Sequence, residues 1–266
     1  GRKTNATFID DWYSELKRID LRALFTALIL ILAPSLMATE RQIMSLFSYH
    51  NKPPFMVDNS SRSGLYYDFA SYLNLKQDQY TFEVIYVPRK RLDRLIESDE
   101  LNGFVIGVSP VWFKDKEEAK YLWLDSFYDD RDEFVSLKTS PFNYVSKQSF
   151  NDKTVVGVAG FYYFGINESV DAGNLLRIDT IGELQSLQLI EKKRADFAIV
   201  SRSVFNYLKA QNSLQDIYHM SPIPHDQFNR RLLTTKNNKA LHEKLAPIMK
   251  AIKQDQLWLD ILAKYE

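Results

Sequence analysis

Residue types that carry most catalytic and metal chemistry are sparse in this chain of 266 residues. The chain has no cysteine, which excludes disulfides, thiolate metal sites and thiol nucleophiles. The four histidines are His50, His219, His225 and His242. Their spacing fits no metal site, and the sequence holds no nucleophile elbow and no phosphate-binding glycine loop. We therefore expect no catalytic set, no metal site and no cofactor, although a site assembled from distant residues stays open.

Aromatic content and balanced charge are the notable features of the composition. Tyr, Phe and Trp make up 14% of the chain, and such side chains either fill a core or line a binding cleft. Rings in a cleft suit ring-bearing, cationic or sugar-like ligands, through stacking and cation–π contacts. The 34 basic and 34 acidic residues cancel, which argues against nucleic-acid binding because that class carries a basic excess. The adjacent acids Asp129-Asp130 suggest a solvated loop.

The N-terminal segment has the pattern of an export signal. Residues 23–38 are uncharged, follow three basic residues and end in small side chains. As a helix this run would span roughly 24 Å, less than the ~30 Å core of a bilayer. We predict a signal peptide with an N-terminal extension over residues 1–38, cleaved after Ala38, and a periplasmic location. An uncleaved anchor and a buried core helix are the alternatives.

Beyond residue 39, short apolar runs alternate with amphipathic stretches. Buried strands are predicted over residues 42–47, 81–87, 104–108, 154–159, 175–178 and 197–200. Helices are predicted over residues 65–75, 89–98, 181–193 and 203–210, with a longer helical pattern over 239–265 that breaks near Gln254. Asp179-Thr180 is a candidate cap for the helix from Ile181. The alternation predicts an α/β fold of mostly parallel sheets covered by helices.

Two stretches of the chain resemble one another. Residues 95–109 and 189–201 each read as a helix end, a turn, a buried strand and a serine at the strand exit. This similarity would place Ser109 and Ser201 at the carboxyl ends of strands, where ligands bind in open α/β sheets. A coincidence between common strand sequences is the alternative.

A series of short motifs follows in a fixed order along residues 41–266. They are Tyr49–Phe55 (YHNKPPF) with Gly64–Phe69, Val87–Arg91 with Asn102–Phe104, Ser109-Pro110 with Tyr121–Trp123, Val155–Val158, Arg194–Ala198, and Leu232–Lys236 with Leu257–Tyr265. The series resembles the periplasmic solute-binding proteins of the amino-acid type (family 3).

The resemblance implies a type II periplasmic binding fold, in which two α/β lobes joined by a two-stranded hinge close on a ligand. Lobe 1 would comprise residues 39–138 and 232–266, and lobe 2 residues 139–231. The chain would cross between them near residues 135–141 and 229–235. The resemblance also implies a small-molecule solute as partner, which the protein would deliver to an inner-membrane ABC permease or report to a sensor. We further expect a monomer, and no nucleic-acid partner given the balanced charge.

The chain departs from the family pattern at both ends of the amino-acid clamp. Where the family has an arginine for the ligand carboxylate, this sequence has Lys114, which lacks the planar two-donor fork. Where the family has an aspartate for the ligand ammonium, it has Ser201, and a neutral hydroxyl cannot balance a desolvated ammonium. We therefore do not expect an ordinary α-amino acid as the ligand.

The candidate ligand contacts combine aromatic residues on expected cleft loops with a few polar ones. They are Tyr49, Phe55, Arg91, Ser109, Trp112, Phe113, Lys114, Gly160, Phe161, Tyr162 and Ser201. Arg91 is included because relatives with a Pro-x-x-Arg element turn that arginine toward the cleft. Several of the rings could instead fill the core, and Asp196 is expected to be structural.

The sequence thus predicts a binding protein, not an enzyme, that takes up or senses a small polar or aromatic solute. The alternative is a periplasmic enzyme of the dehydratase or lyase type on the same scaffold. A cleft carboxylate with a raised pKa beside a histidine or lysine would support that alternative. A third possibility is a binding domain that has lost transport and serves as an interaction or sensory module.

Overall fold

The computed structural model describes residues 40–265, and the predicted signal peptide over residues 1–38 lies outside them. Within the described range, no helix has both the length and the apolar character of a membrane span. Ten strands form the sheet structure, in the order β2-β1-β3-β10-β5-β8-β6-β7, with β4 paired to β10 and β9 to β5. The strands are β1 (Gln42–Ser48), β2 (Tyr80–Tyr86), β3 (Gly103–Val108), β4 (Leu122–Trp123), β5 (Tyr128–Leu137), β6 (Lys153–Val158), β7 (Leu175–Thr180), β8 (Phe197–Ser201), β9 (Tyr218–Met220) and β10 (Asp226–Thr234).

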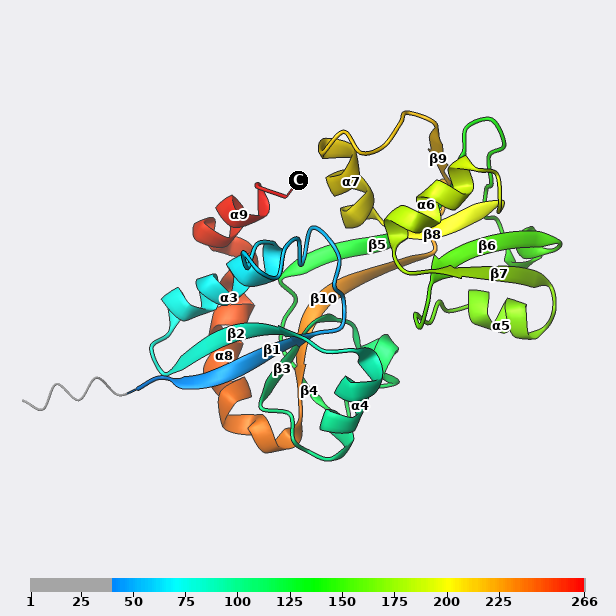
Figure 1. The fold of residues 1–266 in the computed structure, drawn as a ribbon. Helices are drawn as coiled ribbons and strands as arrows, with labels where there is room; N and C mark the ends of the chain where they lie inside the picture. The colour runs from blue at the N-terminus through cyan, green and yellow to red at the C-terminus, as the bar shows by residue number, and fades with distance from the viewer. Residues whose placement is uncertain (1–39, 266) are drawn as a thin grey trace, which may run out of the picture. The chain divides into compact units, whose positions relative to one another are not determined.

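The sheet has two parallel parts joined by two antiparallel strands. Strands β2, β1 and β3 pair in parallel and form the first half-sheet. Strands β8, β6 and β7 pair in parallel and form the second half-sheet. Between them β5 and β10 pair antiparallel over residues 128–132 and 226–230, and Figure 1 shows both strands running from one half-sheet to the other. This fold confirms the predicted α/β class with mostly parallel sheets.

Helices cover each half-sheet. They are α3 (Leu65–Lys76), α4 (Arg89–Glu97), α8 (Lys239–Ala251) and α9 (Gln256–Leu262) on the first half-sheet, and α5 (Ile166–Asp171), α6 (Glu183–Glu191) and α7 (Arg202–Ala210) on the second. The 3-10 turns are η1 (Pro110–Phe113), η2 (Lys147–Phe150), η3 (Lys236–Asn238) and η4 (Ile252–Gln254). The predicted break near Gln254 is confirmed, because η4 separates α8 from α9.

Buried side chains alternate between the two faces of each half-sheet. In β1, Leu46 belongs to the cluster under α3, α8 and α9, whereas Phe47 belongs to the cluster under α4. In β6, Val155 and Val156 likewise enter two different clusters. Successive strand residues point to opposite faces, so two-sided burial requires the continuous apolar runs seen in the sequence.

The six predicted strands and the predicted helices are all present, with ends that shift by a few residues. The predicted cap at Asp179-Thr180 is wrong, since Thr180 ends β7 and α6 begins at Glu183 after Gly182. The joining strands begin to pair at residue 128, earlier than the predicted crossing near residue 135. The lobe boundaries at residues 138/139 and 231/232 stay predictions.

Candidate functional site

A cavity of about 560 Å³ lies where the parallel strands of both half-sheets end. Its lining side chains follow the carboxyl ends of β1, β2, β3, β6 and β7, and include the last residue of β8. Strands β5 and β10 contribute the remaining ones. This edge is where open α/β sheets bind ligands, and the volume is that of a small-molecule pocket.

Seven of the eleven predicted contacts line this cavity. They are Tyr49, Trp112, Lys114, Gly160, Phe161, Tyr162 and Ser201. The structure thus brings together residues from four separated segments, as the family resemblance implied. Their roles as ligand contacts stay predictions.

Four predicted residues lie elsewhere. Phe55 is fully buried in the core under α3, where it stacks on Tyr66, and Phe113 is buried in the cluster under α4. Arg91 is exposed on α4, and it is Arg89, two residues earlier in the chain, that lines the cavity. Ser109 lies in a second pocket.

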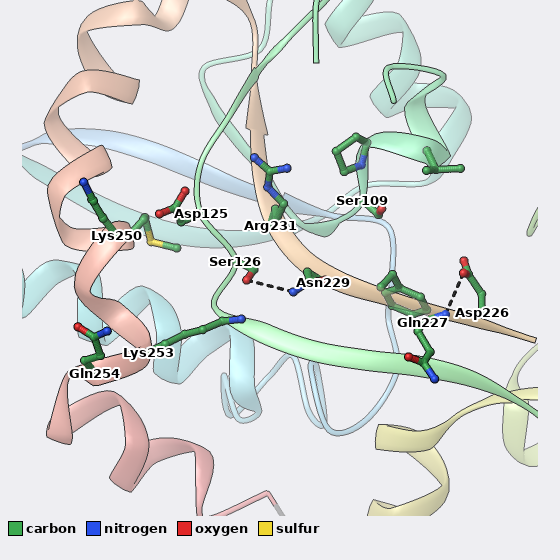
Figure 2. A pocket seen from close by; sticks show the side chains of 14 residues that line it. Ser109, Asp125, Ser126, Asp226, Gln227, Asn229, Arg231, Lys250, Lys253 and Gln254 are labelled. Atoms are coloured by element: carbon green, nitrogen blue, oxygen red, sulfur yellow. Dashed lines mark hydrogen bonds between the residues drawn. The ribbon is translucent and has the colours of Figure 1, made fainter. Parts of the chain in front are cut away.

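Figure 2 shows that second pocket, which has a volume of about 620 Å³ and lies between β10 and α8. Several of its polar side chains are engaged: Asn229 donates a hydrogen bond to Ser126, as Figure 2 shows. Lys253 forms an ion pair with Asp129. No buried side-chain atom that lacks a hydrogen-bond partner lies among its described lining residues. The first cavity is therefore the stronger candidate site.

Aromatic rings meet across the first cavity. Phe161, which follows β6, packs edge-on against Tyr49 and His50, which follow β1, with ring centroids 6.5 Å and 5.6 Å apart. Trp112 packs against Phe228 of β10 at 4.6 Å. Such rings offer an apolar, stackable surface for a planar ligand.

The loop that carries Phe161 is held in place by neighbouring hydrogen bonds. Arg177 donates from one terminal nitrogen to the carbonyl oxygens of Val158 and Phe161, each at 3.0 Å. Gly160 has φ +80°, a left-handed conformation that favours glycine. These contacts hold the backbone of the loop that carries Phe161.

Arg230 is a buried cation at the base of the cavity. Its Nε and one terminal nitrogen donate to Asp130 Oδ2 at 3.0 and 2.7 Å, and its other terminal nitrogen donates to the carbonyl oxygen of Gly107 at 3.0 Å. The guanidinium lies 4.1 Å from the centre of the Phe55 ring. Asp130 is thus a buried partner in β5, and the predicted solvated loop at Asp129-Asp130 is wrong.

Two further cations line the same side. Arg89 donates to Asp93 at 2.8 Å and to the Trp112 carbonyl at 3.1 Å, and its guanidinium lies over the Phe113 and Tyr49 rings. The Lys114 side chain makes no ion pair or hydrogen bond with the described residues. Lys114 is therefore a cation open to an anionic ligand group.

The opposite side of the cavity is acidic, and Lys52 reaches it from the first half-sheet. Lys52 Nζ donates to Glu183 Oε1 at 2.6 Å and to Ser201 Oγ at 2.8 Å. Ser201 Oγ also lies 3.0 Å from Asp132 Oδ1. We call Asp132, Glu183 and Ser201 the acidic subsite.

Burial sets the protonation of several lining groups. It raises the pKa of Asp132 to about 6, against the opposing effects of Lys52 and His225 and with the help of Glu183 and Asp130. Burial also lowers the pKa of His50 well below its usual range, and nearby cations add to this, so His50 is neutral.

Two buried lining atoms have no hydrogen-bond partner, His50 Nδ1 and Glu183 Oε2. Buried polar atoms are nearly always paired, so these two mark positions where a ligand or water would bond.

The sequence interpretation missed the charged pairs, Lys52 with Glu183 and Asp130 with Arg230. Their partners lie 131 and 100 residues apart in the chain, a separation that local patterns do not report. Only Glu183 could have been noticed from the local sequence. It is an acidic residue in the first turn of a predicted helix, where the helix dipole stabilises a negative charge.

No protein-family model matches the chain, and no curated protein matches its sequence. Solved structures match across most of it. The substrate-binding protein of an amino acid ABC transporter has a TM-score of 0.62 and 18% identity over 84% of this chain and 98% of that one.

Two other matches have a TM-score of 0.61 and each cover 84% of this chain. One is the ancestral amino acid-binding protein AncCDT-1, a precursor of cyclohexadienyl dehydratase, at 14% identity over 95% of its chain. The other is the periplasmic VFT2 domain of BvgS from Bordetella pertussis, at 15% identity over 93% of its chain. At these identities the likeness shows the fold alone, and the predicted fold is confirmed: the described chain has the mixed α/β fold of the amino-acid-type, type II periplasmic binding proteins.

Proposed function

We propose that this protein is a periplasmic solute-binding protein that closes two lobes on a small polar or aromatic solute, for ABC-type uptake or for sensing. The observation that carries the proposal is the cavity of about 560 Å³ at the strand ends, with facing rings and two buried polar atoms left unpaired. The likeness in fold to the substrate-binding protein of an amino acid ABC transporter supports a solute-binding role.

Closure would act through β5 and β10, the two strands that join the half-sheets. A ligand favours the closed state only by binding it more tightly than the open one. Phe161 on one side and Tyr49 on the other would meet a planar solute together, so both contacts form only when the lobes approach.

The cavity suits a free α-amino acid poorly. Lys114 supplies a point charge in place of a two-donor fork, and the acidic subsite already holds the Lys52 ammonium. A solute with a carboxylate near Lys114 and a ring in contact with Tyr49 and Phe161 fits the free groups better.

The test is a thermal-shift panel of amino acids, polyamines, aromatic acids, sugars and short peptides on residues 39–266, followed by calorimetric titration of any hit. A ligand at 100 times its Kd adds about 2.7 kcal/mol of stability, enough for a clear rise in Tm. Phe161→Ala should weaken binding of the hit about tenfold, whereas Asn229→Ala in the second pocket should leave Kd unchanged. Equal losses in both variants, or a panel without any hit, would contradict the proposal.

A second candidate function is a dehydratase or lyase reaction in the same cavity. The observation that favours it is the raised pKa of Asp132, a carboxyl within one serine hydroxyl of the Lys52 ammonium. A carboxyl with this raised pKa could exchange a proton with a bound solute near neutral pH. Mass spectrometry of the hit after prolonged incubation would detect loss of water, and Asp132→Asn should abolish it. Recovery of the compound unchanged would contradict the enzyme function and leave binding as the proposed function.

A further inference from the structure

We propose that Lys52 is a built-in ammonium occupant of the acidic subsite, so that the cavity selects ring-bearing carboxylates without a primary amino group. This inference rests on the proposed function, because it names the solute class of the same cavity. Its first experiment needs no natural solute and so can fail or succeed independently.

The contacts of Lys52 are those that recognise a primary ammonium. Its Nζ donates to a carboxylate at 2.6 Å and to a hydroxyl at 2.8 Å, and it lies 5.8 Å from the centre of the Phe161 ring. An ammonium has three N–H donors and prefers charged oxygen acceptors of this kind. The acidic subsite therefore has the acceptors of an ammonium-binding site, and the Lys52 ammonium occupies it.

The pair is withdrawn from solvent, unlike most lysine ion pairs in the described part of the chain. The side chains of Lys52 and Glu183 are 14% and 4% exposed, whereas those of Lys138 and Asp216 are 51% and 90% exposed. Exposed pairs contribute little, but a withdrawn pair is costly to break because a carboxylate is left without its partner. Lys52 thus holds the subsite against competitors.

A solute amine would have to displace this lysine. The tether gives the Lys52 ammonium an effective concentration near the millimolar range or above, which a dilute free amine does not match. The described groups of the cavity that remain without a partner favour a solute that carries a negative charge and a hydrogen-bond donor. Lys114 has no anionic partner among the described residues, and Glu183 Oε2 has no donor.

Removal of the lysine side chain should turn the subsite into a binding site for small amines. The experiment compares wild type with Lys52→Ala in ethylammonium chloride, with tetramethylammonium chloride as the probe that has no N–H donor. Ethylammonium should raise the Tm of Lys52→Ala by about 2–4 °C and saturably, with no such rise in wild type. Tetramethylammonium should give no saturable rise in either protein.

Two further variants isolate the subsite. Glu183→Gln added to Lys52→Ala should abolish the response to ethylammonium, because it removes the carboxylate charge. Lys138→Ala, which opens an exposed ion pair, should show no response. A Tm of Lys52→Ala that does not change with ethylammonium, or that changes equally in wild type or with tetramethylammonium, would overturn the assignment.

If Lys52→Ala does not fold, Lys52→Met keeps the aliphatic stem and takes its place. In wild type, the ¹⁵N resonance of the Lys52 ammonium supplies a second measurement. Its three protons should exchange slowly with water, and Glu183→Gln should make the exchange at least tenfold faster. Rapid exchange in wild type would show that the ammonium is solvated and would overturn the proposal.

The solute class has its own measurement. Calorimetric titration of wild type with 3-phenylpropionate and with phenylalanine compares two ring-bearing carboxylates that differ by one amino group. Wild type should bind 3-phenylpropionate at least tenfold more tightly than phenylalanine. In Lys52→Ala the ratio of the two Kd values should be smaller. Preference of wild type for phenylalanine would overturn the proposed class.

Discussion

The two walls of the cavity carry opposite charges. The wall that follows the first half-sheet presents Lys52, Arg89 and Lys114, whereas the opposite wall presents Asp132 and Glu183. Lys52 is the group that crosses from one wall to the other. An ion pair therefore already joins the two walls without a solute. Among the cations of the first wall, Lys114 has no anionic partner among the described residues.

The largest effect should come from the junction beneath the walls, where Arg230 and Asp130 are each 1% exposed. Arg230→Met would leave Asp130 as a buried charge without its main partner, and should lower the free energy of unfolding by about 3–5 kcal/mol. Urea unfolding measures the loss. The matched control is Lys253→Met, which opens the exposed pair with Asp129 and should cost less than about 1 kcal/mol. Equal losses would show that burial does not set the strength of these pairs.

The next effect concerns the contact between the walls. Lys52→Met should lower the free energy of unfolding by about 2 kcal/mol, because Glu183 loses the donor to its buried carboxylate. The double variant Lys52→Met with Glu183→Met removes both charges and should be more stable than the single variant. Urea unfolding of the three proteins tests this order, and a double variant less stable than the single one would contradict it.

The acidic wall should also give the protein a specific pH dependence. Burial raises the folded-state pKa of Asp132 from 3.8 to about 6, so the folded state retains the proton between these values. Stability should therefore fall as the pH rises from about 4 to about 6, by about 1–2 kcal/mol relative to Asp132→Asn. Urea unfolding of both proteins across this range measures the difference. A wild type that becomes more stable relative to Asp132→Asn as the pH rises would contradict the raised pKa.

The smallest effect on stability should come from Lys114, the cation of the cavity without an anionic partner among the described residues. Lys114→Gln should change the free energy of unfolding by less than about 0.5 kcal/mol, since Lys114 makes no ion pair with the described residues. It should nevertheless weaken binding of an anionic solute about tenfold, as calorimetric titration would show. Unchanged affinity would remove Lys114 from the site.

The apolar pattern was sufficient for the half-sheets and insufficient for the strands between them. Residues 104–108 and 197–200 are buried on both faces, so their composition is that of a strand. Strand β5 begins YDDRDE, and several of these charges pair with residues far away in the sequence, as Asp130 does with Arg230. Its polar composition therefore resembles a loop.

The loops of the candidate site could likewise be predicted from the sequence, but its charged pairs could not. Loops after strands, such as the one with Phe161, follow from the strand prediction and the family resemblance. The side of a helix that faces a cavity does not follow from them: the family pattern predicts Arg91, whereas Arg89 lines the cavity. The crossing of Lys52 to Glu183 depends on how two distant segments meet, and no local pattern encodes it.

We infer that a solute binds between the two walls while Lys52 stays on the acidic one. A crystal structure of the protein with the first compound that raises its Tm would show both features. We expect that compound in contact with Tyr49 and Phe161, with its anionic group near Lys114 and Lys52 Nζ still bonded to Glu183. A compound bound in the second pocket, or an amino group of the compound in place of Lys52, would contradict it.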